Sequence, residues 1–119
     1  MFALKHAHLD DGAQGQNLYA MGSTDPSPQP VSSVAVTGTQ AWLAEESIYD
    51  KGPPGFGEQT GHYTQVVWKA STSLGCAVHT TPKPVPAAGT TQPYTWTVLA
   101  CNYSPAGNVD GEFASQVSK

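Results

Sequence analysis

Two stretches of the 119-residue chain decide its fold: residues 61–68, with the sequence GHYTQVVW, and residues 98–109, with the sequence VLACNYSPAGNV. β-Branched and aromatic residues dominate 63–68 and also 94–103, and these residue types favour β-strands. We therefore predict one strand over 63–68 and another over 94–103, with a loop following each.

A further strand is predicted over 74–80, and it should form a hairpin with the strand at 94–103. If the turn of this hairpin is centred near residue 88 or 89, Cys76 lies opposite Cys101. Opposed residues in an antiparallel pair are close enough for a disulfide, so the pairing favours a single bridge. Two buried free thiols, as in a cytosolic protein, are the alternative.

A helix is predicted over about 39–50, where Trp42 and Tyr49 define one apolar face at helical spacing. Glu45 lies on that same face. A carboxylate beside an apolar stripe is either paired and turned towards a cleft or solvated at the edge of the helix, and the spacing alone favours the solvated position.

The rest of the chain is predicted to be irregular, because Gly, Pro, Ser and Asn recur in it. With 119 residues the chain has room for one domain, 1–119. The irregular segments are a loop over 1–20 with a turn near 16–19, an extended Pro/Ser-rich loop over 22–33, a loop over 51–61, a wide turn over 82–89, and a tail over 104–119 anchored by Phe113.

The charge pattern argues against two classes of partner. Charged residues make up 12% of the chain, the formal net charge is −4, and the five basic residues are lysines spread from one end to the other. Binding to nucleic acid or to an anionic membrane through charge needs a basic patch, which this sequence lacks. Nor does any apolar run reach the length needed to span a bilayer.

Histidine is the residue type most suggestive of chemistry. His62 follows Gly61 at a predicted corner between loop and strand, where an imidazole can be a metal ligand, a general base or a structural hydrogen-bonding group. A zinc site would need two or three further ligands, of which Glu45 is one candidate. His6, His8 and His79 are the other histidines, and we expect His6 and His8 to be solvated.

Residues 61–68 and 98–109 resemble the two signature sequences of the CAP superfamily, in the order and with a gap typical of it. This superfamily comprises the cysteine-rich secretory, antigen 5 and pathogenesis-related 1 proteins, which share the SCP/TAPS domain. Residues 15–18 (GQNL) are similar to its Gly-Glu-Asn-Leu element, and 42–45 (WLAE) to its Trp-x-x-Glu helix. The loop at 54–56 is most similar to that of fungal members resembling pathogenesis-related 1.

The resemblance implies an α+β fold, an α-β-α sandwich with a mostly antiparallel central sheet. It also implies that the N-terminal helical part of the domain is missing from this chain. Loss of that part would leave apolar sheet surface open. We expect the domain to fold nonetheless around the helix at 39–50 and the three predicted strands.

The family implies a cleft formed by two histidines and two glutamates. Carried onto this sequence, His62 is one histidine and Glu45 is one glutamate. The second glutamate falls at Gln16, which is neutral, and the second histidine belongs to a helix that would precede this sequence. Because one imidazole and one carboxylate are lost, we expect neither a functional zinc site nor any other cofactor.

The resemblance further implies a secreted, non-enzymatic module that binds a sterol or fatty acid through the loop from Tyr49 to Gly61. Tyr49, Pro54 and Phe56 would be the lipid-contacting residues. We expect the protein to be extracellular, although the first residues of this chain contain no apolar signal core.

Two other functions remain open. One is a zinc-dependent hydrolase that uses His62 and Glu45. The other is an interaction scaffold without a small ligand, recognised by a host or cell-wall partner.

Overall fold

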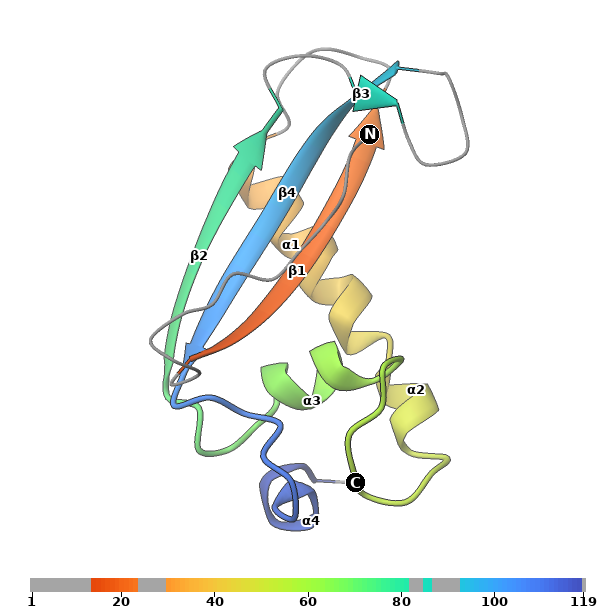
Figure 1. Ribbon diagram of the computed structural model, residues 1–119, viewed down its shortest axis with the longest axis vertical. Coiled ribbons are helices and arrows are strands. Elements are labelled where there is room, and N and C mark those ends of the chain that lie inside the picture. Colours follow the sequence, from red (N-terminus) through yellow and green to blue (C-terminus); the bar gives the residue numbers. More distant parts are fainter. Residues whose placement is uncertain (1–13, 24–29, 82–84, 87–92, 119) are drawn as a thin grey trace.

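The computed structural model describes residues 14–23, 30–81, 85–86 and 93–118. Within them helices and an antiparallel sheet combine in one α+β arrangement, as predicted (Figure 1). The elements, in chain order, are β1 (Gly15–Ser23), α1 (Val31–Leu43), α2 (Glu46–Tyr49), α3 (Gly61–Val66), β2 (Ser73–Thr80), β3 (Val85–Pro86), β4 (Pro93–Ser104) and α4 (Phe113–Gln116).

The sheet is built around β4, which pairs antiparallel with β1 along one edge and with β2 along the other. The two-residue strand β3 pairs with the first residues of β4. Cys101 lies opposite Asn17 on β1 and opposite Cys76 on β2. Cys76 and Cys101 form a disulfide, with their Cα atoms 4.1 Å apart. The hairpin pairing expected from the sequence is therefore confirmed.

Alternation along β4 decides which side chains enter the core. Leu99 and Cys101 are buried, and they face α1, which lies across one face of the sheet (Figure 1). The remaining helices α2, α3 and α4 gather at one end of the sheet. A second core cluster forms among them, from Tyr49, Tyr63, Trp68, Phe113 and Val117.

Helix α1 contacts the sheet through residues four positions apart: Val34, Gly38 and Trp42, all of them buried. This spacing places the three residues on one face of the helix. Gly38 makes the closest approach, because a Cβ at this position would lie 2.6 Å from Leu99 Cδ2 and 3.2 Å from the Tyr19 ring. A bare backbone at residue 38 therefore sets the distance between helix and sheet.

The predicted strand at 63–68 is wrong, because these residues belong to helix α3 and the turn after it. Tertiary bonds override the strand preference of the sequence. The Tyr63 amide donates to the Glu45 carboxylate, and the Thr64 hydroxyl donates to the Asn108 side chain. Both bonds come from residues distant in the sequence, so the residue types of 63–68 alone do not predict the helix.

The predicted loop over 1–20 is also wrong from Gly15 onward, where β1 begins. Nine consecutive residues of β1 pair with β4, so long-range pairing makes this strand in spite of weak local propensity. The loop predicted over 22–33 is shorter than expected: Gly22 and Ser23 end β1, and α1 starts at Val31. Residues 1–13 and 24–29 lie outside the described residues.

The remaining corrections concern element boundaries. The single helix expected over 39–50 is two helices, since α1 starts at Val31 and a turn at Ala44 and Glu45 separates it from α2. The tail after Ser104 contains the short helix α4, and Val117 is buried beside Phe113 as a second anchor. Within the wide turn at 82–89 only β3 is described.

Gly38→Val should lower the free energy of unfolding, because three extra carbons would overlap Leu99 and Tyr19 in a filled core. Overpacking of this kind costs about 1–3 kcal/mol. Thr37→Val introduces the same side chain at the adjacent exposed position and should have little effect. Denaturant unfolding of both variants measures the difference, and equal stabilities would contradict the close approach.

Candidate functional site

The candidate site is centred on the Glu45 carboxylate, which joins the turn after α1 to the start of α3. Its Oε2 accepts a hydrogen bond from His62 Nδ1 at 2.9 Å, and its Oε1 accepts one from the Tyr63 amide at 3.0 Å. The Glu45 side chain is 18% exposed and that of His62 34% exposed. The carboxylate therefore fixes the orientation of the imidazole, because it binds Nδ1 as an acceptor.

Neighbouring groups hold His62 from two further sides. The Trp42 ring stacks on the imidazole, with the ring centroids 6.0 Å apart and an interplanar angle of 18°. The buried Asn17 side chain donates to the His62 carbonyl at 3.0 Å and to Tyr103 Oη at 3.4 Å. Helix α1, through Trp42, and strand β1, through Asn17, thus both position His62.

A cleft of about 230 Å³ lies beside His62. Its polar walls include Gln16, Glu58 and Asn108, and Phe56 lies at its border. The Gln16 amide donates to Asn102 Oδ1 at 3.1 Å on the neighbouring strand. The full lining is Gln16, Asn17, Phe56, Glu58, Gly61, His62 and Asn108.

The buried Gln65 side chain holds this cleft to the loop after β4. Its Oε1 accepts from the Gly107 amide at 2.8 Å, and its Nε2 donates to Ser71 Oγ at 2.9 Å. A Cβ at Gly15 or at Gly107 would overlap the Gln65 amide. Glycine at these two positions lets strand β1 and the loop approach the same side chain from opposite sides.

Asn108 completes the opposite wall in a left-handed conformation, with φ at 58°. Its Oδ1 accepts from Thr64 Oγ1 at 2.6 Å, and its Nδ2 donates to the Gly61 carbonyl at 3.0 Å. Asparagine tolerates this backbone region better than most residues. The loop after β4 is therefore bonded directly to the first turn of α3, beside His62.

Of the site residues selected from the sequence, the structure brings some together at the cleft and places another elsewhere. Glu45 and His62 are directly bonded, so the solvated position that helical spacing favoured for Glu45 is wrong. Gln16 shares the cleft with His62, whereas the described His79 lies on β2. His6 and His8 lie outside the described residues.

Sequence reasoning missed several residues that position this site, among them Asn17, Trp42 as a stacking partner, Glu58, Gln65 and Asn108. One signal could have found two of them. Gln65 and Asn108 lie within the two quoted stretches, and buried amides need partners.

The donor set among the described residues does not fit a zinc ion. Tetrahedral zinc takes four nitrogen, sulfur or oxygen ligands, at least three of them from the protein. No group of three or more His, Cys, Asp and Glu residues that could hold a metal comes together in the described part of the chain. Here the one imidazole of the cleft is bonded to Glu45 through Nδ1, and Gln16 supplies a neutral amide.

The fold and this cleft define a class of protein, and comparison with known sequences identifies it. The model of the cysteine-rich secretory protein family, CAP, matches residues 4–103. The chain belongs to this family, and the family predicted from its two signature stretches is confirmed.

Known relatives and structures agree with this assignment. The chain is 42% identical to protein PRY2 of Saccharomyces cerevisiae over 65% of its own length and 20% of that protein. It is 35% identical to pathogenesis-related protein 1B of Nicotiana tabacum, covering 92% of the chain and 54% of that protein. The chain thus spans about half or less of the length of these relatives.

Among solved structures, the chain is similar to NaASP2 with Zn2+, with a TM-score of 0.61, 26% identity, and coverage of 90% of this chain and 52% of that one. BmVAL-1 matches with a TM-score of 0.60 and 22% identity, covering 82% and 46% of the two chains. These matches confirm the α+β fold. Separately, no helix within the described segments is long and apolar enough to cross a membrane.

Removing the Glu45 carboxylate should destabilise the domain. Glu45→Ala leaves His62 Nδ1 and the Tyr63 amide without their acceptor, and an unsatisfied, partly buried donor costs about 1–3 kcal/mol. Glu46→Ala, which removes an exposed carboxylate that accepts a hydrogen bond from Tyr63 Oη, should cost less. Urea unfolding compares the two variants.

A double-mutant cycle tests the bond between Glu45 and His62. The loss of unfolding free energy caused by His62→Ala should be smaller in the Glu45→Ala background than in the wild type. Additive losses would argue against a stabilising contact between the two residues.

Tyr63 should make the stability depend on alkaline pH. Burial, and then the hydrogen bond to the Glu46 carboxylate, raise the pKa of Tyr63 from 10.0 to about 12. Because the folded state holds this proton more tightly than the unfolded state, stability is complete below pH 10 and falls as pH rises towards 12. Absorbance of tyrosinate should show the late titration, and Tyr63→Phe should weaken the pH dependence. A Tyr63 titration near pH 10 would contradict this.

Proposed function

We propose that this chain is an extracellular, non-enzymatic binding module that takes an amphipathic lipid, a sterol or a fatty acid, at the loop between α2 and α3. The observation that carries the proposal is Phe56. Its side chain is 59% exposed in a loop that borders two hollows of different character. Ile48 is also exposed and lines one of these hollows together with Phe56, and contiguous exposed apolar residues mark binding surfaces.

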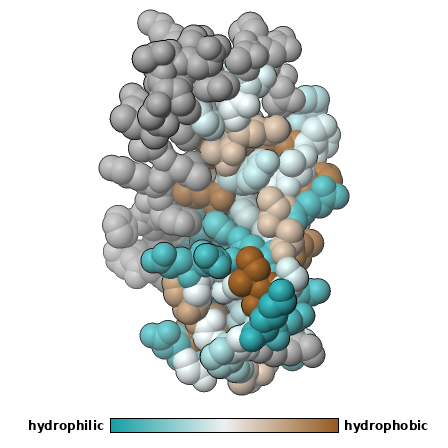
Figure 2. Space-filling model, turned by 90° about the vertical axis from the view of Figure 1, so that its right-hand side faces the viewer, coloured by the Kyte–Doolittle hydropathy of each residue, from teal (hydrophilic) through white to brown (hydrophobic). Residues whose placement is uncertain are grey.

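The second hollow, of about 330 Å³, suits an uncharged part of a ligand. Its lining contains no charged residue, and it is formed by Ile48, Tyr49, Gly52, Pro53, Pro54, Gly55, Phe56, Gly57 and Thr60. Ile48 is 47% exposed beside it. In the view of Figure 2, hydrophobic residues interrupt the hydrophilic surface in the lower half of the molecule, the end at which α2 and α3 lie.

Phe56 lies between this hollow, whose lining is uncharged, and the cleft that contains Glu58 and His62. Such an arrangement suits a ligand with a hydrocarbon body and a single polar end. The hydrocarbon would pack on Phe56 and the prolines, while a hydroxyl or carboxyl group would reach the polar cleft. Binding pockets typically combine an apolar lining with a few orienting polar groups in this way.

Contacts with α3 and with the core fix the position of the loop that contains Phe56. A Cβ at Gly61 would lie 2.9 Å from the Phe56 ring, so the ring rests on the bare start of α3. On the other side Tyr49 is buried in the second core cluster. Of the three residues selected from the sequence, Phe56 and Pro54 thus face the hollow, and Tyr49 also anchors its wall to the core.

Two features support extracellular location and a non-enzymatic role. The family is described as secretory, and a disulfide holds β2 to β4, as is common in exported proteins. The polar cleft offers one His–Glu pair and no fitting zinc donor set among the described residues, so the hydrolase alternative has no support from the site. A scaffold without a small ligand is an outcome of the experiment below.

Titration with a fluorescent sterol and a fluorescent fatty acid should show saturable binding of one of them to the wild-type chain. Phe56→Ala should weaken it about 10–100-fold, because burial of a phenylalanine side chain is worth about 1.5–3 kcal/mol. Val36→Ala, which truncates an exposed apolar residue of α1, is the control and should bind normally. No saturable binding of either lipid would reject the proposal in favour of a scaffold, and unchanged binding by Phe56→Ala would place the ligand elsewhere.

A further inference from the structure

We propose that the outer edge of strand β2 is a self-association surface, at which two copies of this chain pair antiparallel, edge to edge. Strand β2 lies at the end of the sheet order β1-β4-β2, and no other strand of the described residues pairs with its outer side. An edge strand is a template for another strand. The question is therefore whether this edge is protected.

The backbone groups that β2 offers can be identified from its pairing with β4. The Thr81 amide donates to the Trp96 carbonyl at 2.8 Å, just beyond the last residues of the register. Because inward and outward groups alternate along an antiparallel strand, the amides and carbonyls of Cys76 and Val78 point away from β4. The Cα atoms of Cys76 and Cys101 are 4.1 Å apart, a distance typical of an opposed pair without mutual hydrogen bonds. This distance supports the assignment of the Cys76 amide and carbonyl to the outer side of β2.

The outer edge of β1, at the other side of the sheet, differs from that of β2 because a side chain caps it. The same alternation directs the Leu18 carbonyl on β1 away from β4, and Trp42 Nε1 donates to this carbonyl at 3.2 Å. Asn17 and Leu18 are themselves buried. The Trp42 indole thus caps the outer edge of β1 at Leu18, while the described residues provide no equivalent for β2.

Side chains that normally protect an edge are also missing from β2. Natural edge strands carry lysine, other charges, proline or a bulge to prevent pairing. The sequence of β2 is SLGCAVHT, without proline, lysine, arginine, aspartate or glutamate. Its first five residues, Ser73 to Ala77, are all exposed, and Leu74 is 66% exposed.

These properties favour a second copy as the occupant. An antiparallel edge presents amide and carbonyl groups that match an identical edge related by a two-fold axis. Because β2 has no charged side chain, two copies meet there without local repulsion, although each chain carries a net charge of −4. Pairing would join two sheets into one continuous sheet across the axis.

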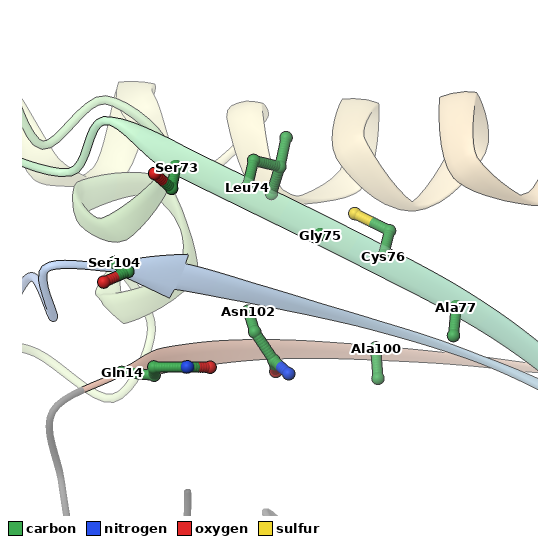
Figure 3. Close-up of a pocket in the computed structure, with 9 residues that line it drawn as sticks. All are labelled: Gln14, Ser73, Leu74, Gly75, Cys76, Ala77, Ala100, Asn102 and Ser104. Carbon is green, nitrogen blue, oxygen red and sulfur yellow. The ribbon is translucent and has the colours of Figure 1, made fainter. Parts of the chain in front are cut away.

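The face of the sheet next to this edge is hollowed over β2 and β4, so little bulk stands beside the β2 backbone. The hollow has a volume of about 490 Å³ and a floor of small residues, Gly75, Ala77 and Ala100. Figure 3 shows Ala77, Ala100 and Asn102 projecting to the same side of the strands. A Cβ at Gly75 would meet nothing within 4 Å.

The expected dimer is weak. Stable interfaces bury about 1,200–2,000 Å² in total, which is more than one strand edge provides. We therefore expect a monomer–dimer equilibrium that shifts with protein concentration in the micromolar to millimolar range, about the affinity of small transient interfaces.

Sedimentation equilibrium over this concentration range should show a mass that rises towards twice that of the monomer. Amide hydrogen exchange then locates the contact. The amides of Cys76 and Val78 should exchange more slowly as concentration rises, whereas those of Ala77 and His79, which point to β4, should be protected at every concentration. This alternation is an internal control that other modes of association would not reproduce.

A variant tests the same surface by another route. Leu74→Lys places a charge on the exposed edge and should weaken dimerisation at least about 10-fold, as edge lysines do in natural sheets. Val36→Lys introduces the same charge on the exposed face of α1 and should leave dimerisation unchanged. A chain that stays monomeric at millimolar concentration would overturn the proposal. So would a dimer in which Cys76 and Val78 amides exchange as in the monomer, or one that responds equally to both lysine variants.

Discussion

The structure depends on strand β4, the only strand of the described residues that is paired along both edges. Its alternation fixes which residues of β1 and β2 enter the core, because each neighbour is in register with it. At Cys101 three constraints meet: the disulfide to Cys76, the pairing with Asn17, and burial beneath α1. The alternation of backbone groups along β4 also directs the Leu18 carbonyl of β1 outward, to the Trp42 indole. It directs the Cys76 amide and carbonyl of β2 away from β4. One strand thus decides which backbone groups of β1 and β2 point outward.

The site depends on the sheet only indirectly, through side chains that cross between elements. The Glu45 carboxylate joins the end of α1 to the start of α3, and Asn17 joins β1 to the same turn of α3 through the His62 carbonyl. Because Trp42 both stacks on His62 and donates to Leu18, the indole couples the cleft to the edge of the sheet. The cleft around His62 is therefore held by contacts within the protein, none of which requires a metal.

The sequence predicted the family, the antiparallel hairpin and the disulfide, because these follow from long motifs and from counting residues between two cysteines. It did not predict β1 or α3. Gly15, Gln16 and Asn17 have weak strand propensity, and only pairing with β4 makes them a strand. Tyr63 and Thr64 favour a strand, but bonds to Glu45 and Asn108 hold them in a helix. In both cases the deciding partner lies at least 18 positions away, where local patterns carry no information. The same limit explains the cleft: Glu45 and His62 could be selected singly, but their contact depends on the turn after α1.

The two proposed surfaces belong to separate parts of the core, and this has a physical consequence. The loop with Phe56 rests on α3 and on Tyr49, which belongs to the cluster with Tyr63, Trp68 and Phe113. Strand β2 is instead held by β4 and contacts the cluster of Val34, Leu99 and Cys101 through Val78. The two regions are linked through the Trp42–His62 stack and through Asn17, which bonds the His62 carbonyl and Tyr103. Because close-packed cores yield little to small forces, lipid binding and edge pairing should proceed independently in the same molecule.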